Sequence, residues 1–191
     1  LLCSNWSVCS AGRFILVNGT FVSDVECQLC DRDHYQPLPT TEHCQPCPSG
    51  RFTRVTPSSH AHDSSTDCVL PPIIYSLSPL TAPTLGSTKI SLHGSYFGTP
   101  TSAINISVGG RQWPDITRHN STWISALSLP GSGANHSLYL SIDGIKGVTN
   151  ASTLFSYYPP NISSVISPPF QGGTLQVRGT NFGQNLNKIA V

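Results

Sequence analysis

The sequence predicts an all-β protein in which a disulfide-rich region is followed by a β-sandwich and by the start of a second one. Three observations support this class. All seven cysteines lie within the first 68 residues. The residues that follow alternate apolar and polar side chains, which is the pattern of strands with one buried face. Motifs from this second region recur 85 to 89 residues later, which indicates a repeated module.

Asparagines in the Asn-x-Ser/Thr pattern are unusually frequent. Seven of the ten asparagines stand in this acceptor pattern for N-linked glycans, far more than chance placement would give. A sequon is used only in the secretory pathway and only where the asparagine is exposed. The pattern therefore predicts an extracellular or cell-surface protein with covalent N-glycans and no other cofactor. The expected sites are Asn5, Asn18, Asn105, Asn120, Asn135, Asn150 and Asn161.

The overall composition limits the partners. Charged residues make up only 10% of the chain, so hydroxyls and glycans must supply much of the solubility. The formal net charge of +1 argues against nucleic acid, because phosphate binding needs clustered Lys and Arg. No apolar run approaches the roughly 18 to 20 residues that cross a bilayer. The chain also opens without a signal-peptide pattern, so we interpret it as mature or as a segment of a longer protein.

The cysteine spacing allows two interpretations. Cys27-x2-Cys30 followed by Cys44-x2-Cys47 has the spacing of a four-thiolate zinc site. Zinc would leave Cys9 and Cys68 unexplained, and an oxidising compartment converts neighbouring thiols into disulfides. We therefore expect disulfides, although six cysteines permit 15 pairings and the sequence alone does not choose among them.

Three segments of this region share one sequence motif, a cysteine followed by a short turn and an aromatic residue: Cys9–Phe14, Cys30–Tyr35 and Cys47–Phe52. The second differs because Asp33 replaces the turn glycine. Over residues 3–68 the pattern resembles the cysteine-rich repeats of ephrin-receptor-like and tumour-necrosis-factor-receptor-like ectodomains. The resemblance implies one bridge within each repeat, and Cys3 is then left over with a partner upstream or in another chain. The implied bridges are Cys9 with Cys27, Cys30 with Cys44, and Cys47 with Cys68.

A domain boundary is expected near Val69–Pro72, where the cysteines stop and two prolines stiffen the chain. Beyond it, strands are expected around Ile90–Leu92, 104–108 and 138–142, each with one apolar face. This alternation places Asn105 on the wet face. Glycine-containing turns of the hairpin type are expected at Gly109-Gly110, Gly131–Gly133 and Asp143-Gly144.

An internal repeat carries the second resemblance. Pro71–Pro79 recurs as Pro160–Pro168, and Ile90–Gly98 recurs as Leu175–Gly183, a period close to the size of an immunoglobulin-like sandwich. The motifs resemble the IPT/TIG family, the immunoglobulin-like fold shared by plexins and transcription factors, over residues 71–158. They are Ile74-x-x-Leu-Ser-Pro79, Gly86-Ser-Thr88, Leu92-x-Gly94-x-x-Phe97-Gly98, Val108-Gly-Gly110, Thr122-x-Ile124 and Phe155-x-Tyr157.

This resemblance implies three parts: a disulfide-rich region at 1–70, an IPT/TIG sandwich at 71–158 and the N-terminal part of a second IPT/TIG domain at 159–191. Many extracellular members carry a cysteine pair near the positions of Trp113 and Ala126, so this copy is expected to hold its sheets together by packing alone. Trp113 is accordingly expected to fill the core. Half a sandwich would expose an apolar face, so we expect the chain to continue beyond Val191 or a neighbouring molecule to supply strands.

The sequence contains no pattern that predicts catalysis, and we expect no catalytic, cofactor-binding or metal-binding residue. Its two glutamates, Glu26 and Glu42, both lie in the cysteine region and are interpreted as solvated loop residues. His60-Ala-His62-Asp63 lacks a third convergent ligand and is interpreted as a polar loop rather than a metal site.

The sequence therefore predicts a non-catalytic, N-glycosylated extracellular structural protein, a segment of a modular stalk or fibril assembled through protein-protein contacts, mainly between copies of itself. The alternative is a receptor or adhesion ectodomain that binds a protein ligand through an aromatic patch. A third class, an accessory domain of a starch-processing enzyme, is disfavoured by the neighbouring cysteine framework. The aromatic residues of the alternative are Tyr96, Phe97, Tyr157 and Tyr158.

Overall fold

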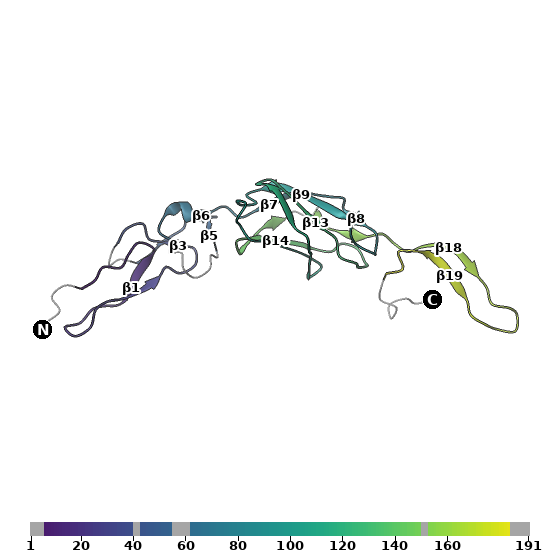
Figure 1. Ribbon diagram of the computed structural model, residues 1–191, viewed down its shortest axis with the longest axis horizontal. Coiled ribbons are helices and arrows are strands. Elements are labelled where there is room, and N and C mark those ends of the chain that lie inside the picture. The colour runs from purple at the N-terminus through teal and green to yellow at the C-terminus, as the bar shows by residue number, and fades with distance from the viewer. Residues whose placement is uncertain (1–5, 40–42, 55–61, 150–152, 184–191) are drawn as a thin grey trace. The chain divides into compact units, whose positions relative to one another are not determined.

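The computed structural model describes residues 6–39, 43–54, 62–149 and 153–183 (Figure 1). Within these residues the regular structure is β, apart from 3-10 structure at Ser65–Asp67 and at Thr153. The chain divides into two compact units, and each is described separately below. The first unit comprises Leu1–Pro72 with Ser141–Lys146, and the second comprises Ile73–Leu140 with Gly147–Val191.

The cysteine-rich region consists of three small antiparallel strand pairs. The region has few large buried side chains, because units of this size bury too little apolar surface to form a core of their own. A 3-10 turn, η1 (Ser65–Asp67), precedes the last strand and is closed by a capping box between Ser64 and Asp67. The pairs are β1 (Arg13–Val17) with β2 (Glu26–Leu29), β3 (His34–Tyr35) with β4 (Gln45–Pro46), and β5 (Phe52–Thr53) with β6 (Cys68–Val69).

The turn after the first cysteine of each repeat has the same backbone form. Gly12 and Gly50 adopt φ of 77° and 75°, and Asp33 adopts 65° at the equivalent position. Aspartate tolerates this left-handed region better than most residues, because its short side chain bonds locally. Here the Asp33 carboxylate accepts the Thr53 N–H at 3.1 Å, and the Asp33 N–H donates to Thr53 Oγ1 at 2.9 Å. The replacement of glycine by Asp33 therefore leaves the positive φ of this turn in place.

The region after Pro72 folds into a sandwich of two sheets with an additional short strand pair. The five-stranded sheet has the order β12-β13-β9-β7-β16, and the four-stranded sheet has the order β11-β10-β14-β15. The first sheet contains β7 (Ile73–Ser78), β9 (Lys89–Ser95), β12 (Thr117–Asn120), β13 (Trp123–Leu127) and β16 (Val148–Thr149). The second contains β10 (Ile104–Val108), β11 (Arg111–Gln112), β14 (Leu138–Ile142) and β15 (Ile145–Lys146). The additional pair is β8 (Thr81–Ala82) with β17 (Ser156–Tyr157).

The core of the sandwich is formed by apolar strand residues that the sequence alternation predicted to be buried. Successive strand residues point to opposite faces, and in β9 the residues Ile90, Leu92 and Gly94 are buried while those between them are not. Trp113 is 2% exposed and packs edge-on against Phe155, with ring centroids 5.1 Å apart, as expected for a core filler. Asn105 is exposed, as the alternation predicted. The other large core side chains include Ile74, Ile90, Leu92, Phe97, Ile106, Ile124 and Leu140.

Two of the three expected glycine turns are hairpins. Gly109-Gly110 joins β10 to β11, and Asp143-Gly144 joins β14 to β15, all four residues having positive φ. The prediction for Gly131–Gly133 was wrong, because this segment connects β13 to β14, which lie in different sheets. Its glycine serves close packing instead, since a β-carbon on Gly131 would lie 2.5 Å from Cζ of Tyr157.

The last described strands, β18 (Asn161–Ile166) and β19 (Gln176–Thr180), form a separate antiparallel hairpin (Figure 1). Its register repeats that of β7 and β9. Ile74 faces Gly94 in the first copy and Ile162 faces Gly179 in the second, and a bulge follows directly in both. The internal sequence repeat is therefore also a repeat of strand pairing.

Candidate modification and interaction sites

Six cysteines form three disulfide bridges. The structure joins Cys9 to Cys27, Cys30 to Cys44, and Cys47 to Cys68, with Cα atoms 5.6 to 5.7 Å apart. These sulfur atoms are consumed in bridges, so the alternative four-thiolate zinc site cannot form from them. Each bridge closes a loop of 14 to 21 residues, which in a chain-entropy model restricts the unfolded state by about 3 kcal/mol.

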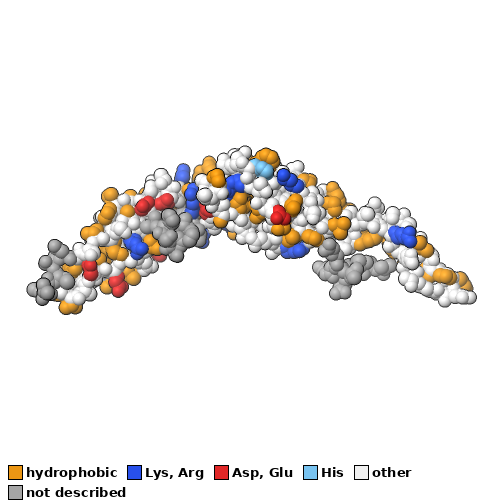
Figure 2. Space-filling model, viewed as in Figure 1, with side chains coloured by type: hydrophobic (Ala, Val, Ile, Leu, Met, Phe, Trp, Pro, Cys, Tyr) orange, Lys and Arg blue, Asp and Glu red, His pale blue; other side chains and the backbone are white. Residues whose placement is uncertain are grey.

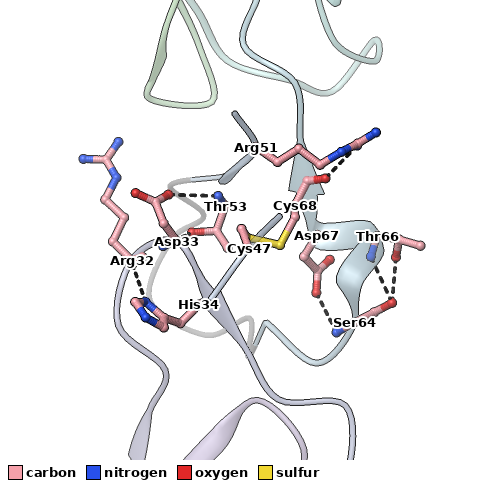
Figure 3. Close-up of a disulfide and its surroundings, with 10 residues drawn as sticks. All are labelled: Arg32, Asp33, His34, Cys47, Arg51, Thr53, Ser64, Thr66, Asp67 and Cys68. Carbon is pink, nitrogen blue, oxygen red and sulfur yellow. Dashed lines mark hydrogen bonds between the residues drawn. A yellow bond between two sulfur atoms is a disulfide. The ribbon is translucent and has the colours of Figure 1, made fainter. Parts of the chain in front are cut away.

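Hydrogen bonds reinforce the third bridge, Cys47–Cys68 (Figure 3). Arg51 Nη1 donates to the carbonyl oxygen of Cys68 at 3.1 Å. The capping turn precedes Cys68 directly, and its Ser64 Oγ accepts the Thr66 N–H at 3.2 Å. One backbone hydrogen bond also recurs between repeats, since Cys30 N–H donates to Gly12 O and Cys47 N–H donates to Asp33 O. The bridges and these backbone bonds together replace the missing apolar core.

The five sequon asparagines within the described residues are all exposed: Asn18, Asn105, Asn120, Asn135 and Asn161. Asn5, Asn150 and the left-over Cys3 lie outside the described residues. Exposure is the condition that a glycosylation site must meet, because the glycan is bulky and hydrated.

The sequon at Asn120 occupies the tight turn between β12 and β13. Asn120 Oδ1 accepts both the backbone N–H and the hydroxyl of Thr122, each at 2.8 Å. Such a bond to the backbone two residues on is the Asx-turn that asparagine favours. Both hydrogen bonds use Oδ1, whereas a glycan would be attached at Nδ2. The turn therefore fixes the direction of the Asn120 side chain, and it leaves Nδ2, the atom to which a glycan would be attached, outside these hydrogen bonds.

A row of three rings crosses the outer face of the five-stranded sheet beside this turn. Trp123 stacks on His119 with centroids 3.8 Å apart, and on His93 at 5.8 Å. His119 Nε2 also lies 2.9 Å from Ser125 Oγ. Sequence reasoning missed this row, which we call the His-Trp-His ladder. It depends on the pairing register of β12, β13 and β9, which no local pattern reveals.

The four aromatic residues considered for ligand binding differ in exposure, so they do not form a single exposed aromatic patch. Phe97 is wholly buried in the core, whereas Tyr96 and Tyr158 are exposed. Tyr157 is half-buried, and its hydroxyl donates to the carbonyl oxygen of Leu129 at 2.8 Å. Burial raises the pKa of Tyr157, and the nearby Arg111 guanidinium opposes this in part. Phe97 is thus a structural residue, because its ring fills the space above Gly94.

Charged side chains are sparse, and Figure 2 shows them scattered among uncharged ones on the visible face. Glu26 is exposed, as is Asp63, while Glu42 and His60 lie outside the described residues. Hydrogen bonds from the Ser7 hydroxyl and N–H lower the pKa of Asp24. No cluster of three or more His, Cys, Asp or Glu side chains able to hold a metal occurs in the part of the chain that the structure describes. Nor do those residues include a helix long and apolar enough to span a bilayer.

Comparisons with known proteins agree with this architecture. Residues 72–157 match the IPT/TIG domain family, and residues 19–68 match the family described as tyrosine-protein kinase ephrin type A/B receptor-like. No curated protein matches the chain.

Two solved structures are among those to which this chain is similar. A candidate phosphatase from Bacteroides thetaiotaomicron is 22% identical over 50% of this chain, with a TM-score of 0.35. The extracellular region of plexin A4, domains 1 to 10, is 14% identical over 94% of this chain, with a TM-score of 0.44. The chain spans only 19% and 15% of the lengths of these two proteins.

The all-β modules and internal disulfides define a modular extracellular protein of the receptor or adhesion type, located outside the cell or on its surface. More particularly, it contains an ephrin-receptor-like cysteine-rich region followed by an IPT/TIG domain with an immunoglobulin-like fold. Domains of these two kinds are typical of non-enzymatic extracellular receptor modules.

Proposed function

We propose that the chain is a non-catalytic, N-glycosylated segment of an extracellular stalk or fibril that is built from rigid modules. Its assembly depends on protein-protein contacts, mainly between copies of itself or adjoining modules of the same chain. Cys3 is proposed to pair outside the segment, and no cofactor other than covalent glycans is expected.

One observation carries the proposal: every described sequon asparagine is exposed, and such sites occur in the cysteine region, in the sandwich and in the last hairpin. Charged residues amount to only 10% of the chain, so a glycan on each module would supply the solubility that charges do not. A chain whose modules each carry a glycan fits a spacer better than it fits an enzyme with one active site.

The last hairpin supports a contact through its apolar face. Ile162 and Val165 are 58% and 53% exposed, whereas the residues at the same pairing positions of β7, Ile74 and Leu77, are 1% and 4% exposed. We therefore propose that the three parts are 1–70, 71–158 and 159–191, and that the last is the beginning of a second IPT/TIG domain. Further strands, from the same chain or from a neighbour, would cover this face.

A receptor or adhesion ectodomain with a separate protein ligand is the second candidate. The families of both modules favour it, because ephrin-receptor-like regions are described from receptors. Tyr96 and Tyr158 would be available to such a ligand, since both are exposed.

Electron microscopy and sedimentation of the native protein, purified from its secreted form, distinguish the two candidates. Filaments or concentration-dependent oligomers are expected for the structural role. Monodisperse particles that capture a soluble protein would instead support the receptor. Intact mass before and after peptide-N-glycosidase treatment tests the glycans, and a non-reducing peptide map tests the pairing of Cys3.

A further inference from the structure

We propose that the glycan at Asn120 does not project freely but lies in a groove of the IPT/TIG domain that Asn120 itself lines. This inference rests on the proposed N-glycosylation. The groove has a volume of about 540 Å³, within the range of small-ligand sites. Its occupant is an N-acetylglucosamine unit, which would be delivered by its own covalent bond to Asn120 Nδ2.

The two walls of the groove come from segments that are distant in the sequence. One wall is formed by Gly98, Pro100, Ser102 and Ile104, and the other by residues 116–121. Arg118 Nη2 joins the walls by donating to the carbonyl oxygen of Ser102 at 3.2 Å. The groove is therefore preformed, which lowers the cost of ordering a ligand in it.

The first wall is held in place by its own turn. Thr99 N–H donates to Ser102 Oγ at 3.1 Å, and Ser102 N–H donates to Thr99 O at 3.0 Å. This pair of bonds presents the Pro100 ring on an otherwise polar loop. A rigid apolar surface of this kind suits the C–H face of a sugar.

The composition of the walls matches an N-acetylated sugar. Pro100, Ile104 and Ile116 offer apolar contact for ring C–H groups and an acetyl methyl, while Ser102 and Thr117 offer hydrogen bonds to hydroxyl and amide groups. A mixed lining with a few placed polar groups is typical of small-ligand sites. A fully apolar groove would reject the sugar hydroxyls, since they would lose their hydrogen bonds to water.

His119 connects the groove to the His-Trp-His ladder. It lines the groove and also stacks on Trp123 at 3.8 Å, while its Nε2 is held by Ser125. These two contacts hold the His119 ring in one orientation. His93 stacks on the same Trp123 but does not line the groove, so it provides a matched control.

The test uses the 191-residue chain secreted from cells that glycosylate. Peptide-N-glycosidase is added to the native protein, and release from Asn105, Asn120 and Asn135 is followed by glycopeptide mass spectrometry. We expect release from Asn120 to be about tenfold slower than from the other two, a ratio equivalent to about 1.4 kcal/mol of packing. After denaturation, the three rates should become similar.

Two variants connect the protection to the groove. Both His119→Ala and Pro100→Ala should abolish the slow release, whereas His93→Ala should preserve it, because all three side chains are exposed but only the first two line the groove. A circular-dichroism melt of each variant confirms that it is folded.

The outcomes separate the two hypotheses. An occupied Asn120 released as fast as Asn105 and Asn135 would overturn the seated glycan and leave N-glycosylation intact. Protection that survives His119→Ala and Pro100→Ala would also overturn the groove as its cause. An Asn120 that stays unmodified while the other sites are occupied would overturn the inference at its first step, and three bare sites would overturn the proposed glycosylation as well.

Discussion

Gly94 and Phe97 pack so closely that a β-carbon on Gly94 would lie 2.5 Å from Cζ of Phe97. The carbonyl oxygen of Ile73 would block the same position from the paired strand. The relationship recurs in the last hairpin, where a β-carbon on Gly179 would lie 2.7 Å from Cζ of Phe182. In both copies of the repeat, the absence of a β-carbon on the glycine lets the phenylalanine ring pack directly on the backbone.

Gly94→Ala is expected to destabilise the sandwich by about 1 to 3 kcal/mol, because an extra methyl group must displace both the ring and the neighbouring backbone. Chemical denaturation followed by circular dichroism measures the effect. Ser91→Ala, on the same strand, is the control and should change stability by about 0.5 kcal/mol or less. Equal effects of the two substitutions would mean that the close packing is unimportant.

Trp113→Ala should cost about 3 to 5 kcal/mol, since it removes a buried ring and its contact with Phe155. Trp123→Ala should cost much less, because Trp123 lies on the outer face, in the ladder. Thermal melts of the two variants give the comparison. A larger loss for Trp123 would show that the ladder, rather than the core, holds the sandwich together.

These two tryptophans show what the sequence could and could not predict. The alternating strands and the IPT/TIG motifs predicted the fold class, because burial of one strand face follows from a local period of two. The buried Trp113 was predicted from the IPT/TIG resemblance, since it stands near a position where many members carry a cysteine. The ladder and the groove depend on register between strands and on segments 98–104 and 116–121 coming together. Local patterns do not encode such proximity, and the glycines at 131–133 were misread as a hairpin for the same reason.

Tyr157→Phe should destabilise the sandwich by about 1 kcal/mol, the usual net value of a hydrogen bond between neutral groups. The hydroxyl that it removes donates to Leu129 O and ties the last strand of the sandwich to the connection between the sheets. Equilibrium unfolding at neutral pH measures the loss. Unchanged stability would indicate that water replaces the bond without cost.

The same residue should make stability depend on alkaline pH. Burial raises the pKa of Tyr157 in the folded state above its ordinary value of about 10. The folded state therefore holds this proton more tightly than the unfolded state, so the contribution is complete below about pH 10 and is lost as pH rises through the raised pKa. Unfolding series from pH 8 to 11 should show a steeper decline for the natural protein than for Tyr157→Phe. Parallel curves would contradict the assignment.

Reduction should unfold the two regions unequally. All three bridges lie before Val69, and residues 73–191 contain no cysteine, so a reductant should remove about 3 kcal/mol per bridge from the first region alone. Hydrogen exchange read by mass spectrometry should show protection lost in β1 and β2 and kept in β9 and β13. Loss of protection in β9 would mean that the sandwich depends on the cysteine region for its stability.

The parallel pairing of strands from the start of the sandwich with strands from its end has a mechanical consequence. β7 opens the sandwich and pairs in parallel with β16 near its end, and β8 pairs in parallel with β17. Tension applied through the two ends of the domain would load these hydrogen bonds in shear, so that they resist together instead of opening one after another. Such an arrangement suits a link that must transmit force between the modules on either side of it.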